Sequence, residues 1–216
     1  MESASSLSAT LELALARQQL ELPSDQIALL DRYCRVLWKK NEQLNLTRHT
    51  DYDKFVSRDL VDSQWLESFL DAGERVLDVG TGGGVPGIIL AILRPDLEVT
   101  LSDSVAKKAQ AVGEIVAQLD LPVRVVHAPA QALLQQETFE TLVCRAVAPI
   151  SKLLTWFAPV WDSFEKLLLI KGPNWTAERD EAQEKRLLRH VRITKIASYP
   201  LPGTESESVV LQVRRT

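Results

Sequence analysis

The chain has 216 residues, of which 45% are hydrophobic and 25% are charged, with a net charge of −4. These proportions are typical of a globular domain and indicate neither an intrinsically disordered protein nor a membrane protein. No apolar run approaches the ~18 residues of a membrane-spanning helix, and residues 1–3 lack the basic start of a signal peptide, so we expect a cytoplasmic protein. Cys34 and Cys144 show no metal-binding or redox spacing and are expected as reduced, partly buried thiols.

The first third of the chain is predicted to be helical. Residues 1–72 form a helical extension in this interpretation, and residues 73–216 form an α/β domain that is one compact unit. Apolar residues recur at helical spacing in three segments of the extension, which are residues 7–20, 24–44 and 51–70.

The most informative stretch follows the first predicted strand. An apolar run that starts at Val76 reaches Asp78 and then a glycine-rich turn at residues 80–84. Residues 87–93 continue as a buried helix. A second strand begins at Glu98 and ends in Asp103, 23 residues after Gly80. That is the distance at which a βαβ unit places a carboxylate against the ribose of a bound nucleotide.

Two ligand classes fit this turn, a dinucleotide and S-adenosylmethionine. Glycines let the backbone approach a flat ligand, and Gly82-x-Gly84-x-x-Gly87 satisfies the common dinucleotide fingerprint. An acid at Asp78 favours S-adenosylmethionine, because it suits an amino group better than a pyrophosphate. We predict a donor site that contains Asp78, Gly80, Gly82, Gly84 and Asp103. A nicotinamide-dependent oxidoreductase is the alternative, although no Tyr-x-x-x-Lys pair follows the fourth strand.

The rest of the chain alternates strands and helices. Three further parallel strands are predicted at residues 123–126, 139–144 and 166–170, and helices at 105–119, after Pro149 and at 178–189. Residues 191–199 and 208–214 are joined by a turn at 200–203 that is too short for a crossover, so they should pair antiparallel. We therefore expect a Rossmann-like, doubly wound sheet of seven strands with a closing antiparallel hairpin.

Several motifs together resemble the bacterial 16S ribosomal RNA guanine-N7 methyltransferases, also known as glucose-inhibited division protein B. They are Trp38-x-x-Asn41, Leu44-Asn45-Leu46-Thr47, Arg58-Asp59-Leu60-Val61-Asp62-Ser63, Asp78-Val79-Gly80-Thr81-Gly82-x-Gly84-x-Pro86-Gly87, Asp103-Ser104, Arg145-Ala146 and Lys171-Gly172. The resemblance runs from about residue 30 to the last strand. It implies S-adenosylmethionine as donor and a guanine in the 530 loop of 16S rRNA, naked or in the small ribosomal subunit, as acceptor. It also implies a donor site lined by Gly80, Val85, Ala130, Gln131 and Arg145.

The chain departs from that family at four places. Asp59 stands where a histidine is usual, Pro129 where an arginine is usual, Gln131 where an acid is usual, and Glu207-Ser208 where Arg-His is usual. Three of these changes remove positive or ionisable groups that could face RNA. A second hypothesis is therefore a non-catalytic relative that binds the ribosome.

Guanine N7 carries a free lone pair at neutral pH, so it can attack the donor's methyl group directly, and no general base is expected. Catalysis then depends on orientation. Arg145 and Lys171, at neighbouring strand ends, are predicted to position the guanine edge or its phosphate. For each of them the alternative is an ion pair with Asp62 or Asp78.

Asn45, Arg58 and Lys171 are the predicted RNA contacts. Trp38, Trp65 and Trp156 are expected in the core, and only Trp175 is expected to stack on a base. No metal site is expected, and the protein is expected to be a monomer.

Overall fold

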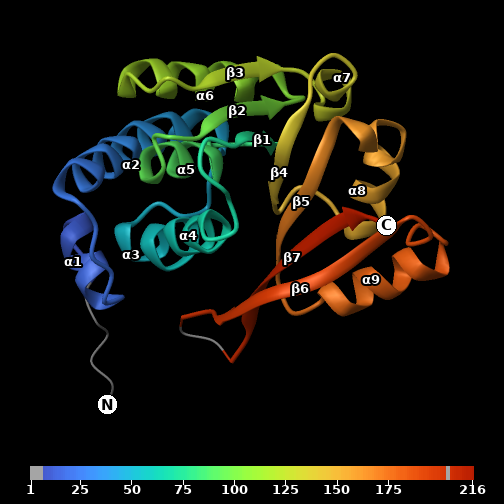
Figure 1. Cartoon of the computed structure of the whole chain (residues 1–216). Coiled ribbons are helices and arrows are strands. Elements are labelled where there is room, and N and C mark those ends of the chain that lie inside the picture. Colours follow the sequence, from blue (N-terminus) through green and yellow to red (C-terminus); the bar gives the residue numbers. More distant parts are fainter. Residues whose placement is uncertain (1–6, 203–204) are drawn as a thin grey trace.

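The computed structural model describes residues 7–202 and 205–216, and one mixed seven-stranded sheet runs through it (Figure 1). The strand order is β3-β2-β1-β4-β5-β7-β6. The strands are β1 (Arg75–Val79), β2 (Glu98–Asp103), β3 (Arg124–His127), β4 (Phe139–Arg145), β5 (Phe164–Lys171), β6 (Val191–Pro200) and β7 (Glu207–Arg215). β1 to β5 pair in parallel, whereas β7 is antiparallel to both β5 and β6. The predicted sheet and its closing hairpin are confirmed. Gly203 of the predicted turn lies outside the described residues.

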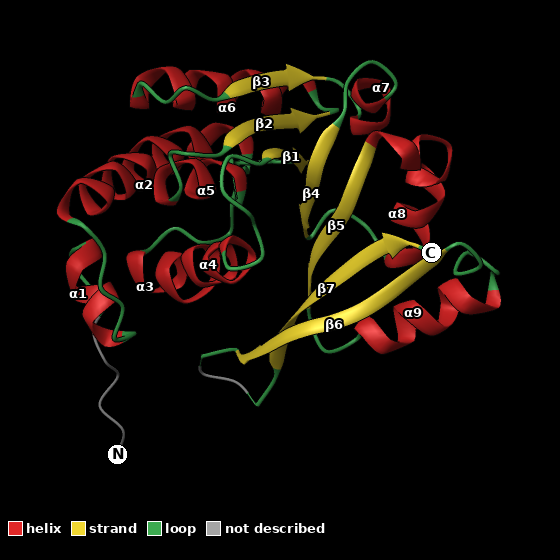
Figure 2. Ribbon diagram, viewed as in Figure 1, coloured by secondary structure: helices red, strands yellow, loops and turns green. Residues whose placement is uncertain are grey.

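Helices cover both faces of the sheet (Figure 2). One face carries α1 (Leu11–Arg17), α2 (Ser24–Leu44), α3 (Tyr52–Lys54), the π-helix η1 (Phe55–Leu60), α4 (Val61–Glu67), α5 (Gly87–Leu93) and α6 (Ala106–Leu119). The other face carries α7 (Ala130–Leu134), α8 (Ile150–Phe157), the 3-10 helix η2 (Ala158–Ser163) and α9 (Trp175–Glu184). The sheet is therefore doubly wound, as predicted.

The strands feed two apolar cores because successive side chains point to opposite faces. In β5, Leu167 and Leu169 join the core beneath α8, while Leu168 and Ile170 join the core beneath α2 and α5. A strand that is buried on both faces reads as a continuous apolar run, which is how β5 appears in the sequence.

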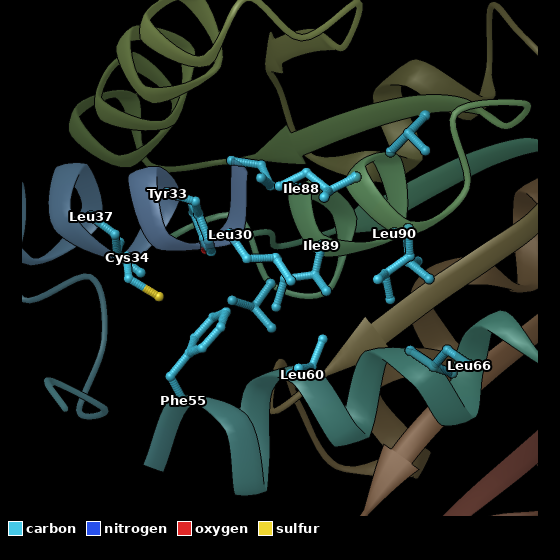
Figure 3. Close-up of a cluster of buried hydrophobic side chains, with 14 of the residues drawn as sticks. Leu30, Tyr33, Cys34, Leu37, Phe55, Leu60, Leu66, Ile88, Ile89 and Leu90 are labelled. Atoms are coloured by element: carbon cyan, nitrogen blue, oxygen red, sulfur yellow. The ribbon is translucent and has the colours of Figure 1, made fainter. Parts of the chain in front are cut away.

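The described helices of the predicted extension share a core with the sheet. Figure 3 shows Leu30 and Tyr33 of α2, Phe55 of η1 and Ile89 of α5 converging in one cluster. Val76 of β1 belongs to the same core and is fully buried. The division of the chain at residue 72 stays a prediction, and residues 1–6 lie outside the described part of the chain.

The segment predicted as one helix over residues 51–70 contains a π-helical stretch instead. The backbone N–H of Val61 bonds to Val56 O, five residues earlier, so this hydrogen bond spans one residue more than the bond of an α-helix would. Apolar spacing does not distinguish the two forms. The structure also ends α9 at Glu184 rather than Arg189, because Arg186 adopts a left-handed φ of 58°.

Other corrections are smaller. The first helix is shorter than predicted and starts at Leu11, after Thr10, whose side chain accepts a hydrogen bond from the backbone N–H of Leu13. Ala130 and Gln131 open the short helix α7. Cys34 and Cys144 are free thiols, as predicted, and both are fully buried rather than partly buried.

Candidate functional site

A cavity of about 800 Å³ lies at the carboxyl ends of β1, β4 and β5. Ligands of open α/β sheets bind at this edge. The loop at residues 45–49 forms part of its wall. The lining residues are Asn45, Leu46, Thr47, Arg48, His49, Arg58, Asp62, Gly80, Thr81, Gly82, Gly83, Val85, Lys108, Arg145, Ala146, Ile170, Lys171, Gly172, Glu178 and Ser208.

The glycine-rich turn after β1 divides into a part that faces the cavity and a part that faces the core. Gly80 and Gly82 line the cavity, with left-handed φ values of 65° and 59°. A Cβ at Gly84 would lie 2.5 Å from Ile88 Cδ1, so that residue packs against α5. Gly84 was predicted in the donor site, and the structure places it behind the turn, where close packing explains the glycine.

Asp78 supports the turn from below. Its Oδ2 accepts hydrogen bonds from Thr81 Oγ1 at 2.6 Å and from Gly87 N at 2.9 Å, and its Oδ1 has no partner among residues 7–202 and 205–216. Burial raises the pKa of Asp78 to about 6, although these two hydrogen bonds act in the opposite direction. The side chain is fully buried and is absent from the cavity lining. A direct contact with the donor's amino group stays a prediction.

Asp103 ends β2 and anchors the backbone beside the cavity. Its Oδ2 accepts from Gly82 N at 3.0 Å and its Oδ1 from Val105 N at 2.8 Å. The residue is 5% exposed. Each carboxylate oxygen keeps a second lone pair, so the predicted ribose contact is compatible with these bonds.

The cavity brings together four of the predicted donor-site residues, which are Gly80, Gly82, Val85 and Arg145. Asp78, Asp103 and Gly84 lie behind its wall. Ala130 and Gln131, at the start of α7, do not line it. Their place in the donor site, which the resemblance implies, stays a prediction.

Arg145 is held between two buried carboxylates. Its Nη1 lies 2.6 Å from Asp59 Oδ1 and 3.2 Å from Asp62 Oδ2. Burial alone would lower the pKa of Arg145, but the two carboxylates, Asp59 foremost, outweigh burial and raise it. Asp62 also accepts a 2.6 Å hydrogen bond from Tyr199 Oη. The alternative role of Arg145, an ion pair with Asp62, is therefore present at the cavity wall.

The 45–49 loop is fixed to the helices on which it lies. Asn41 Oδ1 accepts from Thr47 N at 2.8 Å, and Trp38 Nε1 donates to His49 O at 2.8 Å. His49 Nδ1 lies 2.7 Å from Asp59 Oδ1, so the loop is also tied to the Arg145 cluster. Asn45, with a left-handed φ of 49°, ends α2 and lines the cavity.

Lys171 pairs with neither Asp62 nor Asp78. Its Nζ donates to Ala148 O and to Glu178 Oε2, each at 2.7 Å. Arg58 lines the cavity, and its buried Nε has no hydrogen-bond partner in the described part of the chain. The cavity thus carries all three predicted RNA contacts, Asn45, Arg58 and Lys171.

Sequence reasoning missed several cavity residues. His49 and Lys108 were not singled out, and Asp59, which is buried and contacts Arg145 and His49 without lining the cavity itself, was noted only as a departure from a family pattern. Glu178 carried a signal, because it is an acid in the first turn of the helix that follows Lys171. The pairing of His49 with Asp59 has no local signal, since the two meet only after η1 forms.

Two tryptophan predictions need correction. Trp65 is 36% exposed rather than buried in the core, and it stacks on Tyr199 with ring centroids 5.1 Å apart. Trp175 lies against α8 with the Arg179 guanidinium over its ring, and it does not line the cavity. Trp38 and Trp156 are partly buried against the two cores.

None of the helices within residues 7–202 and 205–216 is long and apolar enough to span a membrane. The same residues contain no cluster of three His, Cys, Asp or Glu side chains arranged to hold a metal.

The strand order, the antiparallel β7 between β5 and β6, and the glycine turn at the cavity define a Rossmann-like methyltransferase fold. Solved structures agree. A human methyltransferase 10 domain containing protein matches with a TM-score of 0.57 over 87% of this chain and 97% of that chain, at 15% identity. A Streptococcus mutans methyltransferase in complex with SAH matches with a TM-score of 0.51 over 72% of this chain and 96% of that chain, at 15% identity.

Sequence comparisons give the family. The family described as rRNA small subunit methyltransferase G matches residues 26–203. A Rhodopirellula baltica protein named Ribosomal RNA small subunit methyltransferase G is 45% identical over 201 residues, 93% of this chain and 87% of the relative. The chain belongs to the rRNA small subunit methyltransferase G family, which confirms the predicted family and enzyme class.

Proposed function

We propose that this enzyme transfers a methyl group from S-adenosylmethionine to N7 of a guanine in the 530 loop of 16S rRNA. Membership of the family and the names of its relatives support a small-subunit RNA substrate. The observation that carries the choice of reaction is the position of Arg145, a clamped arginine that faces the cavity next to the glycine turn.

The donor side of the cavity suits S-adenosylmethionine. Its volume lies in the range of small-molecule sites, and Gly80 and Gly82 offer a backbone surface free of side chains. Gly80, Gly82 and Val85 would hold the donor, with Asp103 behind them at the end of β2. When bound, the donor supplies an electrophilic methyl group on a sulfonium.

Each carboxylate and histidine among the described lining residues already has a partner, which agrees with a nucleophile that needs no general base. Asp62 is engaged by Arg145 and Tyr199, His49 by Asp59, and Glu178 by Lys171. Cys144 is 2% exposed, and burial raises the pKa of its thiol well above the ordinary value, so no thiolate is available for a C5 methylation.

Orientation of the base is the remaining task. Nη1 of Arg145 makes the contacts with Asp59 and Asp62, and Arg145 lines the cavity, so the other donors of the guanidinium can face a substrate. The two buried carboxylates fix the orientation of the guanidinium group. A fixed donor near the guanine edge or its phosphate contributes rate by holding N7, the methyl carbon and the sulfur in line.

Cations at the cavity rim suit an RNA loop. Arg48, Arg58 and Lys108 line the cavity together with Asn45. N7 lies in the deep groove of A-form RNA, so the target guanine must sit in a loop or be splayed out. A local group of cations on a chain of net charge −4 would attract RNA to this edge.

The test is transfer of a labelled methyl group from S-adenosylmethionine to small ribosomal subunits, and separately to naked 16S rRNA, from a strain that lacks the protein. Strand cleavage specific for N7-methylguanine then locates the product. Cleavage at one guanine in the 530 loop is the expected result. Incorporation on another atom would overturn the proposal, and donor binding without incorporation would favour the non-catalytic relative.

A further inference from the structure

Glu178 and Lys171 form a rigid pair on the wall of the cavity. Lys171 ends β5 and Glu178 lies in the first turn of α9. Besides their mutual 2.7 Å contact, Lys171 Nζ donates to Ala148 O, and Glu178 Oε2 accepts from Ile150 N at 2.9 Å. Their side chains are 11% and 28% exposed. Contacts from three segments thus fix the orientation of both groups.

Within the described part of the chain, each partner keeps one unused hydrogen-bonding group. An ammonium group has three N–H donors, and two of those of Lys171 are occupied. The carboxylate of Glu178 receives both its bonds at Oε2, and Oε1 has none from the described residues. Because both residues line the cavity, the pair presents one donor beside one acceptor to whatever binds there.

This donor-and-acceptor pair complements guanine and opposes adenine. The six-membered ring of guanine offers the O6 acceptor followed by the N1–H and N2–H donors. Adenine offers a donor at position 6 followed by an acceptor at N1. Adenine in the same place would set its amino donor against the ammonium of Lys171 and its N1 acceptor against the carboxylate of Glu178. Two donors and two acceptors would then face each other at partly buried charged groups, which is unfavourable.

The order of the strands gives the same orientation. The glycine turn follows β1, Arg145 ends β4, Lys171 ends β5, and Glu178 comes next in α9. Around the edge of guanine the order is N7, O6, N1 and N2. A guanine whose N7 faces the donor therefore turns O6 toward Lys171 and the N1–N2 edge toward Glu178.

We propose that Glu178, oriented by Lys171, reads the N1–H and N2–H groups of the target base and makes the enzyme specific for guanine. This inference rests on the proposed function, because it takes N7 as the methylated atom. It assigns Lys171 a second role, as the donor to O6.

The test changes the base rather than only the protein. Inosine keeps O6, N1–H and N7 but lacks the N2 amino group, so 16S rRNA ligated with inosine at the mapped target isolates the Glu178 contact. We expect the wild-type enzyme to methylate guanosine roughly tenfold to a hundredfold better than inosine, measured as kcat/KM. In Glu178→Ala this ratio should fall toward one, because the acceptor of the amino group is gone.

A merely structural role would give a different result. If Glu178 only tethers α8 to β5, Glu178→Ala would lower kcat/KM for both bases equally and leave the ratio unchanged, which would overturn the inference. Glu181→Ala is the matched control, because Glu181 ties α9 to Ser151 one turn away and does not line the cavity. Its ratio should equal that of the wild type.

Two outcomes separate this inference from the proposed function. If the wild-type enzyme methylates no guanine at N7, the proposed function fails before any variant is compared. If it methylates guanine and inosine equally well, the function stands and the inference is overturned without any variant. Should Glu178→Ala fail to fold, Glu178→Gln keeps the size and one acceptor oxygen, and an intermediate ratio is expected.

Discussion

The hydroxyl of Tyr33 donates a 3.0 Å hydrogen bond to the backbone carbonyl of Gly83. The first residue belongs to α2 and the second to the glycine turn after β1, fifty positions away in the sequence. Tyr33 is fully buried, and its ring packs edge-on against Phe55. Through this bond a helix outside the α/β repeat determines the shape of the turn on which the donor would lie.

Tyr33→Phe removes this bond and keeps the ring. Because Gly83 O would lose its partner in a buried place, we expect a loss of about 1–2 kcal/mol in the free energy of unfolding and weaker binding of S-adenosylhomocysteine. Chemical denaturation and calorimetric titration measure the two effects. Tyr52→Phe is the control, because its hydroxyl bonds to Asp31, away from the turn. Equal donor affinity in both variants would contradict a role for Tyr33 in the turn.

Arg145→Gln removes the arginine that pairs with the buried carboxylates of Asp59 and Asp62. We expect a loss of about 3–5 kcal/mol in the free energy of unfolding, together with the loss of methyl transfer. Adding Asp59→Asn should restore part of the stability but not the activity, since one of the uncompensated charges is removed. Arg35→Gln, at an exposed pair with Asp31, should change stability little. If the losses in free energy of unfolding from Arg145→Gln and from Asp59→Asn simply added up in the double variant, Arg145 and Asp59 would not be coupled.

Asp78 should make the protein less stable as the pH rises from about 4 to about 6. Its pKa is raised from 3.8 to about 6 in the folded state, so in this range the folded chain binds a proton that the unfolded chain does not. The free energy of unfolding then falls as pH rises, by up to about 3 kcal/mol from this group. Below pH 4 the carboxyl is protonated in both states, and this destabilisation is absent.

Denaturation at pH 4 and pH 7 of the wild type and of Asp78→Asn measures this contribution. The wild type should gain stability relative to the variant at pH 4. Glu12→Gln, an exposed change in α1, should follow the wild type at both values. Parallel behaviour of the wild type and Asp78→Asn would show that Asp78 keeps an ordinary pKa.

Gly82→Ala and Gly113→Ala should have opposite effects. Gly82 has a φ of 59°, and an added Cβ would meet nothing closer than 3.9 Å, so the cost is conformational and about 1–2 kcal/mol. Its methyl group would lie beside the cavity and weaken donor binding. Gly113 lies within α6 with open space around it, so Gly113→Ala should raise the free energy of unfolding by about 0.5–1 kcal/mol. Thermal unfolding and donor titration compare them, and a donor affinity equally reduced in both would contradict the assignment of Gly82 to the site.

Much of the architecture could be predicted from residues close together in the sequence. The apolar run into Asp78, the glycines after it and the acid at Asp103 indicate a strand, a tight turn and a second strand, and the structure has all three. The carboxyl ends of parallel strands share one edge of a sheet, so the sequence alone could assign Arg145 and Lys171 to a common site.

Other features depended on contacts that no local pattern encodes. Apolar spacing did not reveal the π-helical turn of η1, and it placed Trp65 in the core although Trp65 lies exposed on Tyr199. The two predicted glycines also differ in role. Gly82 lines the cavity, whereas Gly84 packs closely against Ile88, and the sequence does not show where Ile88 lies.

The order of the strands, the glycine turn and the family could be inferred from the sequence, because each depends on the types and spacing of neighbouring residues. The pairing of Arg145 with Asp59 and Asp62, and of Glu178 with Lys171 on the cavity wall, became visible in the folded chain. Arg145 and Asp62 are 83 positions apart, and their approach depends on the packing of α4 against the sheet. Burial, which gives such pairs their strength, is a property of the assembled core rather than of any segment.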